Sequence, residues 1–167
     1  MLSKMLTENC INLNLTGKPQ AEIIDEMVEI LYSAGKLNDK EEYKKEILKR
    51  ESQSSTGLEE GIAIPHAKTS AVKVPSIAFG LSKEGVDYES LDGEPSKLFF
   101  MIAAPANASD THIEVLSKLT TMLLDDDIRE KLLNAKEPKD VLEILGHENK
   151  EENAEEMAET EKNYDVL

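Results

Sequence analysis

The chain has 167 residues, a length that fits one domain with a sizeable core. Hydrophobic residues make up 40% of the sequence and aromatic residues only 4%, so we expect a folded domain whose core is mostly aliphatic. The formal net charge is −15, and a chain this acidic repels the phosphates of nucleic acids and of anionic lipids, which argues against both as partners.

The first ten residues, MLSKMLTENC, lack the long apolar stretch and the cleavage site of a signal peptide. Cys10 is the only cysteine, which excludes a disulfide within the chain and favours a reducing compartment. Nothing in the sequence approaches an uncharged apolar run of membrane-spanning length. We therefore expect a cytoplasmic protein with no direct membrane insertion.

Alternating apolar and polar residues in NCINLNL, residues 9–15, predict a half-buried strand. Apolar residues then recur at helical spacing over residues 23–31, which predicts a helix that ends at Gly35. Asn38 or Asp39 is suited to cap a second helix through KEEYKKEILKRE. The apolar residues of this second helix, which we expect to face inward, are Tyr43, Ile47 and Leu48.

The second half of the chain predicts two strands and three helices. SIAFGLS and KLFFMIAAP read as strands, the second one buried, and GVDYESLDGEP between them as a loop or hairpin. Ser109 or Asp110 can cap a helix whose expected inward residues are Ile113, Leu116, Leu119, Leu123 and Leu124. Two shorter helices, DIREKLLNA and EPKDVLEILG, follow, with Pro138 in the first turn of the last one. Strands that alternate with helices predict an α/β domain in which helices flank a sheet.

Residues 147–167 have a different composition, with eight acidic residues, two lysines and few apolar residues. Such a segment cannot bury enough apolar surface to pack on a domain. We predict a domain over residues 1–146 and an acidic flexible linker or tail over residues 147–167. A helical docking element built on Met157 and Ala158 is the alternative.

Two histidines are candidates for a functional role. His66 follows IAIP, and the proline holds it at the end of an extended segment. This position suits a functional residue and equally a structural histidine bonded to a backbone carbonyl. His112 lies in the first turn of a predicted helix, where free N–H groups and the helix dipole favour an anion and a neutral imidazole. An exposed residue without function is the alternative for His112.

Arg50 ends the predicted second helix, just before the polar loop that leads to His66. A guanidinium offers several fixed donors to anionic oxygens and stays charged at any working pH. A solvated cation at the helix end is the alternative. The hydroxyl or N–H groups of the loop residues Ser54, Ser55 and Thr56 would add donors to a bound anion.

Other kinds of site lack their usual patterns. The histidines are isolated and no cysteine pair is present, so we expect no metal, although a His/His/carboxylate site in a small hydrolase stays open as an alternative. Neither a G-x-S-x-G elbow nor a P-loop occurs. We expect no cofactor.

Two blocks carry a resemblance to a known family. RESQSSTGLEEGIAIPHAK, residues 50–68, resembles the active-site signature of enzyme IIA of the bacterial sugar phosphotransferase system, fructose/mannitol type. GVDYESLDGEPSKLFFMIAAPANASDTHIEVLSKL, residues 85–119, resembles the second conserved block of that family. The resemblance extends over about residues 5–146, and the second block is closer to fructose-type domains than to the nitrogen-regulatory relatives.

The resemblance implies a phosphotransferase with an α/β fold, a mixed central sheet flanked by helices. It implies that His66 accepts and donates a phosphoryl group, that His112 stabilises this group and that Arg50 pairs with its oxygens. The phosphocarrier HPr would supply the phosphoryl group, and enzyme IIB, coupled to the membrane transporter IIC, would receive it during uptake of fructose or a related sugar. A regulatory nitrogen-type IIA, acting through phosphorylation-dependent protein binding, is the alternative. For docking of either partner we expect an exposed apolar patch around GIAIPH.

Overall fold

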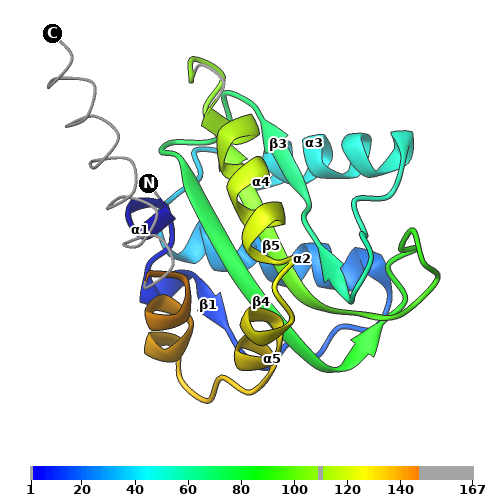
Figure 1. Ribbon diagram of the computed structural model, residues 1–167. Helices are drawn as coiled ribbons and strands as arrows, with labels where there is room; N and C mark the ends of the chain where they lie inside the picture. Colours follow the sequence, from blue (N-terminus) through cyan, green and yellow to red (C-terminus); the bar gives the residue numbers. More distant parts are fainter. Residues whose placement is uncertain (1, 109–110, 147–167) are drawn as a thin grey trace, which may run out of the picture.

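The computed structural model describes residues 2–108 and 111–146 of the chain. In this part of the chain, a five-stranded sheet has the order β1-β4-β5-β2, and β3 also pairs with β5 (Figure 1). β4 and β5 form an antiparallel pair, whereas β1 runs parallel to β4, and β2 and β3 run parallel to β5. The strands are β1 (Ile11–Asn12), β2 (Ile62–Ala63), β3 (His66–Lys68), β4 (Ser76–Val86) and β5 (Ser96–Ala104).

Helices cover both faces of the sheet, with α4 and α5 on one face and α2 and α3 on the other (Figure 1). The helices are α1 (Leu2–Met5), the 3-10 turn η1 (Glu8–Cys10), α2 (Gln20–Ser33), α3 (Lys40–Gln53), α4 (Thr111–Met122) and α5 (Asp126–Leu133), and residues 138–146 are also helical. This arrangement confirms the expected α/β fold with a mixed sheet flanked by helices. Pro138 is the first residue of the last helix, as predicted.

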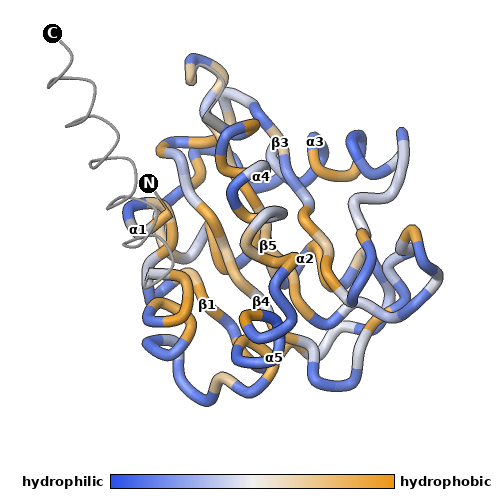
Figure 2. Tube along the Cα trace, in the orientation of Figure 1, coloured by the Kyte–Doolittle hydropathy of each residue, from blue (hydrophilic) through white to orange (hydrophobic). Residues whose placement is uncertain are grey.

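The core lies between the sheet and the two helical layers. From Leu98 to Ala104, β5 is buried throughout, and Figure 2 shows hydrophobic residues along the central strands. The rings of Phe79 and Phe100 meet edge-on, with their centroids 4.9 Å apart. Gly80 lets α2 approach β4 closely, because an added Cβ would lie 2.5 Å from the sulfur of Met27.

Local sequence signals predicted the positions of most helices and strands correctly. The side chains that were wrongly predicted to be buried lie on the surface of a helix or directly after one. Asp39 caps α3 as predicted, since its carboxylate accepts a hydrogen bond from the N–H of Glu42 at 3.0 Å. Leu48, however, is exposed. It lies one residue beyond the buried Ile47, and one residue is a rotation of about 100° around a helix.

The buried stripe of α4 consists of Val115 and Leu119 and continues with Leu123 directly after the helix, with Leu116 partly buried. Ile113 and Leu124, which were expected to face inward, are exposed. Leu124 lies beyond the last residue of α4, where helical periodicity no longer fixes direction. The strand predicted over residues 9–15 covers only Ile11–Asn12. Glu8–Cys10 forms a 3-10 turn before it, and after it the N–H of Asn14 donates to the side chain of Asn12 at 2.9 Å.

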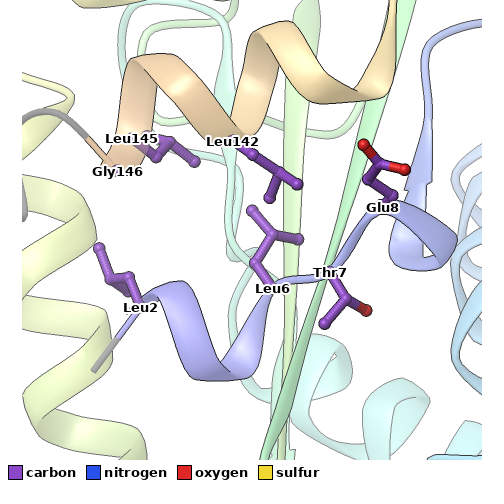
Figure 3. A pocket seen from close by; sticks show the side chains of 7 residues that line it. All are labelled: Leu2, Leu6, Thr7, Glu8, Leu142, Leu145 and Gly146. Carbon is purple, nitrogen blue, oxygen red and sulfur yellow. The ribbon is translucent and has the colours of Figure 1, made fainter.

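Two predictions fall outside the described residues, namely the cap at Ser109 or Asp110 and the acidic segment 147–167. In the described part of the chain, no helix is both long and apolar enough to cross a membrane. A groove of about 300 Å³ lies between α1, at the start of the described residues, and the last helix, at their end. In this groove Leu142 points toward Leu6 (Figure 3).

Candidate functional site

The backbone around His66 is held by the central sheet. His66 is the first residue of β3 and lies opposite Ile102 of β5 in the parallel register. The N–H of Ile102 donates to the carbonyl of Pro65 at 2.9 Å. On the other side of the same residue, the hydroxyl of Tyr43 from α3 donates to the carbonyl of Ile102 at 3.0 Å. The predicted extended segment ending in a histidine is therefore part of the sheet.

The imidazole of His66 is oriented by a backbone carbonyl two residues earlier. Its Nδ1 lies 2.9 Å from the carbonyl oxygen of Ile64. Because a carbonyl only accepts, this bond assigns the proton to Nδ1 and leaves Nε2 as the unprotonated nitrogen of the neutral ring. The bond is the one expected of a structural histidine, and it also leaves the lone pair of Nε2 without a proton.

A tight hairpin leads into His66. The N–H of Leu58 donates to the carbonyl of Ile62 at 2.7 Å, and the N–H of Ile64 donates to the carbonyl of Thr56 at 3.1 Å. The turn passes through Glu60 and Gly61, both with positive φ (61° and 73°). Glycine adopts this backbone region without steric cost, so Gly61 suits the turn. The segment before the histidine is therefore hydrogen-bonded to β5 on one side and to the other arm of the hairpin on the other.

His112 lies in the first turn of α4, which packs on β5. The last residue of β5, Ala104, lies beside Lys68 in the parallel register with β3. Ala104 is two residues after Ile102, which lies opposite His66, so the chain leaves β5 for α4 near His66. The topology thus brings the first turn of α4, in which His112 is half-buried, to the end of β5 that lies near His66.

Arg50 occupies the last turn of α3 and faces the polar loop. Its Nη1 donates to the carbonyl of Ser54 at 2.8 Å and to the Ser54 hydroxyl at 3.4 Å. Among the described residues, the hydrogen bonds of Arg50 go to Ser54 and not to either histidine. A guanidinium has five N–H bonds, so donors remain for an anion.

The hydroxyls of Ser55 and Thr56 already bond to other groups of the protein. Ser55 donates to the carbonyl of Tyr88 at 2.7 Å and accepts from the N–H of Gly57 at 3.0 Å. Thr56, only 4% exposed, bonds through its hydroxyl to the carboxylate of Glu51. Only Ser54 of the three predicted loop residues is exposed, and a role of these residues in binding an anion stays a prediction.

Two buried tyrosines contribute hydroxyl donors near the site. Tyr43 faces inward as predicted, but the sequence assigned no role to its hydroxyl or to Tyr88. Burial raises the pKa of Tyr43, and burial together with the nearby charge of Glu51 raises the pKa of Tyr88. Both hydroxyls therefore stay protonated and donate, Tyr43 to Ile102 and Tyr88 to Glu51. Glu51 was also missed, although it directly follows Arg50 in the sequence.

The expectation of an exposed apolar patch around GIAIPH is wrong. Ile62, Ala63 and Ile64 are at most 5% exposed, because this short run lies between β5 and the other arm of the hairpin. Large apolar side chains are instead exposed at Ile113 (54%), next to His112, and at Leu91 and Leu124. In the described residues, no group of three or more His, Cys, Asp or Glu side chains is placed to hold a metal ion.

The sequence is similar to those of known proteins. Residues 4–148 match the family described as "Phosphoenolpyruvate-dependent sugar phosphotransferase system, EIIA 2". The chain is 54% identical over 149 residues to the fructose-specific EIIABC component of Bacillus subtilis, with 89% of this chain and 24% of that protein covered. It is 40% identical over 122 residues to the fructose-specific EIIA component of Haloferax volcanii, with 73% and 79% covered. The chain thus spans about a quarter of the length of the Bacillus relative.

Solved structures of similar proteins share the fold. The nitrogen regulatory protein IIA-Ntr from Neisseria meningitidis superposes with a TM-score of 0.79 at 31% identity, over 86% of this chain and 97% of that one. IIA mannitol from Escherichia coli gives 0.72 at 30% identity, over 83% and 97%. The IIAMTL structure solved in complex with phosphorylated enzyme IIBMTL, also from Escherichia coli, gives 0.74 at 28% identity, over 86% and 99%. This chain therefore belongs to the EIIA 2 family of the phosphoenolpyruvate-dependent sugar phosphotransferase system.

Proposed function

We propose that this chain carries a phosphoryl group on Nε2 of His66, between the phosphocarrier HPr and enzyme IIB of a fructose uptake system. The observation that supports this most directly is the bond between Nδ1 of His66 and the carbonyl of Ile64. In this tautomer the lone pair of Nε2 attacks phosphorus without first losing a proton. The new N–P bond forms as the bond to the donor breaks, and the proton stays on Nδ1, where the carbonyl stabilises the positive charge that develops on the ring.

The charge on the transferring group needs stabilisation where it develops. The remaining N–H donors of Arg50, in the last turn of α3, and the N-terminal end of α4, which carries His112, are the two sources of positive potential in this proposal. His112 and Arg50 would therefore bind the phosphoryl oxygens, and His66 alone would form the covalent bond.

Similar proteins and one exposed apolar residue support enzyme IIB and HPr as the partners. Enzyme IIB as acceptor is supported by the solved complex of the mannitol relative with phosphorylated IIB, and HPr as donor by the family resemblance. The exposed Ile113 offers an apolar contact directly beside His112 for either partner. The names of the Bacillus and Haloferax relatives support fructose as the sugar.

A regulatory function is the second candidate, because the nitrogen regulatory protein of Neisseria shares the fold closely at 31% identity. Transport is favoured by the higher identity to the fructose-specific relative, 54%. A chain that accepts phosphoryl groups from HPr but never passes them to enzyme IIB would favour regulation.

The decisive variant is His66→Ala, incubated with phosphoenolpyruvate, enzyme I and HPr and then weighed intact by mass spectrometry. We expect one acid-labile phosphoryl group on the wild-type chain and none on the variant. A circular dichroism spectrum of the variant controls for its fold. Stoichiometric labelling of His66→Ala would assign the acceptor to another residue.

A further inference from the structure

The carboxylate of Glu51 is an acceptor shared by three separate parts of the chain. It lies in the last turn of α3 and accepts from the N–H of Thr56 at 3.1 Å and from the hydroxyl of the same residue. The hydroxyl of Tyr88, which follows β4, donates to it at 3.1 Å, and the side-chain amide of Gln20 from α2 does so at 3.3 Å. Four donors therefore converge on two carboxylate oxygens.

A short series of backbone bonds connects Glu51 to the imidazole of His66. Thr56, held by Glu51 through its N–H, accepts at its carbonyl from the N–H of Ile64 at 3.1 Å. The carbonyl of Ile64 in turn lies 2.9 Å from Nδ1 of His66. A displacement of Thr56 would therefore move the carbonyl that sets the ring orientation and the tautomer of the histidine.

The loop that Glu51 holds is closely fitted to its surroundings. The N–H of Leu91 donates to the carbonyl of Gly57 at 3.2 Å, and an added Cβ at Gly57 would lie 2.8 Å from the hydroxyl oxygen of Ser90. Thr56 and Tyr88 are buried, so their donors have no access to bulk water. A buried donor that loses its acceptor destabilises the arrangement that contains it. The loop therefore depends on the carboxylate for its conformation.

We propose that Glu51 is a positioning residue for phosphoryl transfer, which holds His66 through Thr56 and Ile64 in the tautomer with an unprotonated Nε2. The proposal rests on the proposed function of His66 as the phosphoryl acceptor. Glu51 does not touch the reacting atoms, and Arg50 beside it contacts the same loop at Ser54. A side chain at position 51 without a carboxylate would leave the N–H of Thr56 or the hydroxyl of Tyr88 without an acceptor.

The test uses the full chain with Glu51→Ala and the isosteric Glu51→Gln, and Glu41→Gln as control, since Glu41 is an exposed residue of the same helix. The ¹⁵N shifts of the His66 imidazole at pH 8 report the tautomer. We expect one tautomer, protonated at Nδ1, in the wild-type chain and in the control, and a mixture in Glu51→Ala. We also expect the phosphoryl uptake rate at saturating phospho-HPr to fall on the order of tenfold, with KM nearly unchanged.

Tyr88→Phe separates positioning from general stability, because it removes one donor and leaves the bonds between Glu51 and Thr56 in place. We expect this variant to melt at a lower temperature but to keep the tautomer and the uptake rate. If Glu51→Ala does not fold, Glu51→Gln carries the same test. A folded Glu51 variant with the wild-type tautomer and rate would overturn the proposal.

The two proposals fail in different ways. A wild-type chain that takes up no phosphoryl group overturns the function proposed for His66, and the ¹⁵N spectra then decide by themselves whether Glu51 sets the state of the imidazole. Normal uptake by the wild-type chain and by every folded Glu51 variant, with unchanged spectra, overturns only the role of Glu51.

Discussion

Backbone carbonyls near in the sequence orient the two basic side chains on either side of the polar loop. His66 bonds to Ile64, two residues before it, and Arg50 bonds to Ser54, four residues after it. Each bond uses one nitrogen and leaves others available. The polar loop therefore fixes the direction of Arg50, and the hairpin arm before His66 fixes the direction of the imidazole.

Arg50→Lys tests whether geometry or charge matters at the end of α3. A lysine keeps the charge but lacks the planar set of donors, so it cannot bond to Ser54 and to phosphoryl oxygens in the same geometry. We expect the rate of phosphoryl uptake, measured by rapid quench, to fall about tenfold or more. Lys49→Arg, at the exposed neighbouring position, is the control. An unchanged rate in Arg50→Lys would make Arg50 a simple helix-end cation.

The sequence indicated the candidate histidines but not the residues that hold them. The constraint from Pro65 and the helix start before His112 are local signals, and a sequence shows these directly. The partners of Glu51 lie at positions 20, 56 and 88, and only the folded chain brings them together. Burial of GIAIPH was missed for the same reason, since the strand that covers it comes later in the chain.

Among the helices, the positions of the ends were predicted more reliably than the side that is buried. The cap at Asp39 and the end of α2 before Gly35 depend on neighbours within a few residues. Which side of a helix is buried depends on what packs there, and Leu48 and Ile113 were placed wrongly for that reason. The exposure of Ile113 next to His112 was therefore not visible in the periodicity.

The contact between β4 and α2 gives a prediction about stability. Gly80→Ala would place a Cβ 2.5 Å from the sulfur of Met27 and 2.7 Å from a methyl carbon of Leu15. We expect overpacking to lower the free energy of unfolding by about 1–3 kcal/mol, as measured by urea denaturation. Gly146→Ala, where no atom lies within 4 Å, should change it little. Equal stability of the two variants would mean that α2 moves aside at no cost.

For the whole molecule, the charge of −15 is the dominant electrostatic feature. Like charges destabilise the compact state, and salt screens them within a Debye length of about 10 Å at 0.1 M. We expect the melting temperature at pH 7.5 to rise by several degrees between 10 and 300 mM NaCl.

Two controls accompany this salt series. Near the sequence pI of about 4.6 the effect should vanish. A chain that ends at Gly146 should respond less, because its net charge is −9, which is −15 without the −6 of residues 147–167. A falling melting temperature at pH 7.5 would show instead that local pairs such as Lys44 with Asp25 dominate the electrostatics.

If His66 carries a phosphoryl group as proposed, the register between β3 and β5 determines how a partner would distinguish the loaded from the unloaded form. The backbone before His66 is bonded into the sheet, because the N–H of Ile102 donates to the carbonyl of Pro65. The hydroxyl of Tyr43, from α3, donates to the carbonyl of Ile102 and so holds the neighbouring strand β5. A phosphoryl group adds about two negative charges to this site while the strand stays in place. The phosphorylated and unphosphorylated forms would therefore have the same backbone conformation and a different local electrostatic potential. A partner would distinguish them by charge and not by a change in conformation.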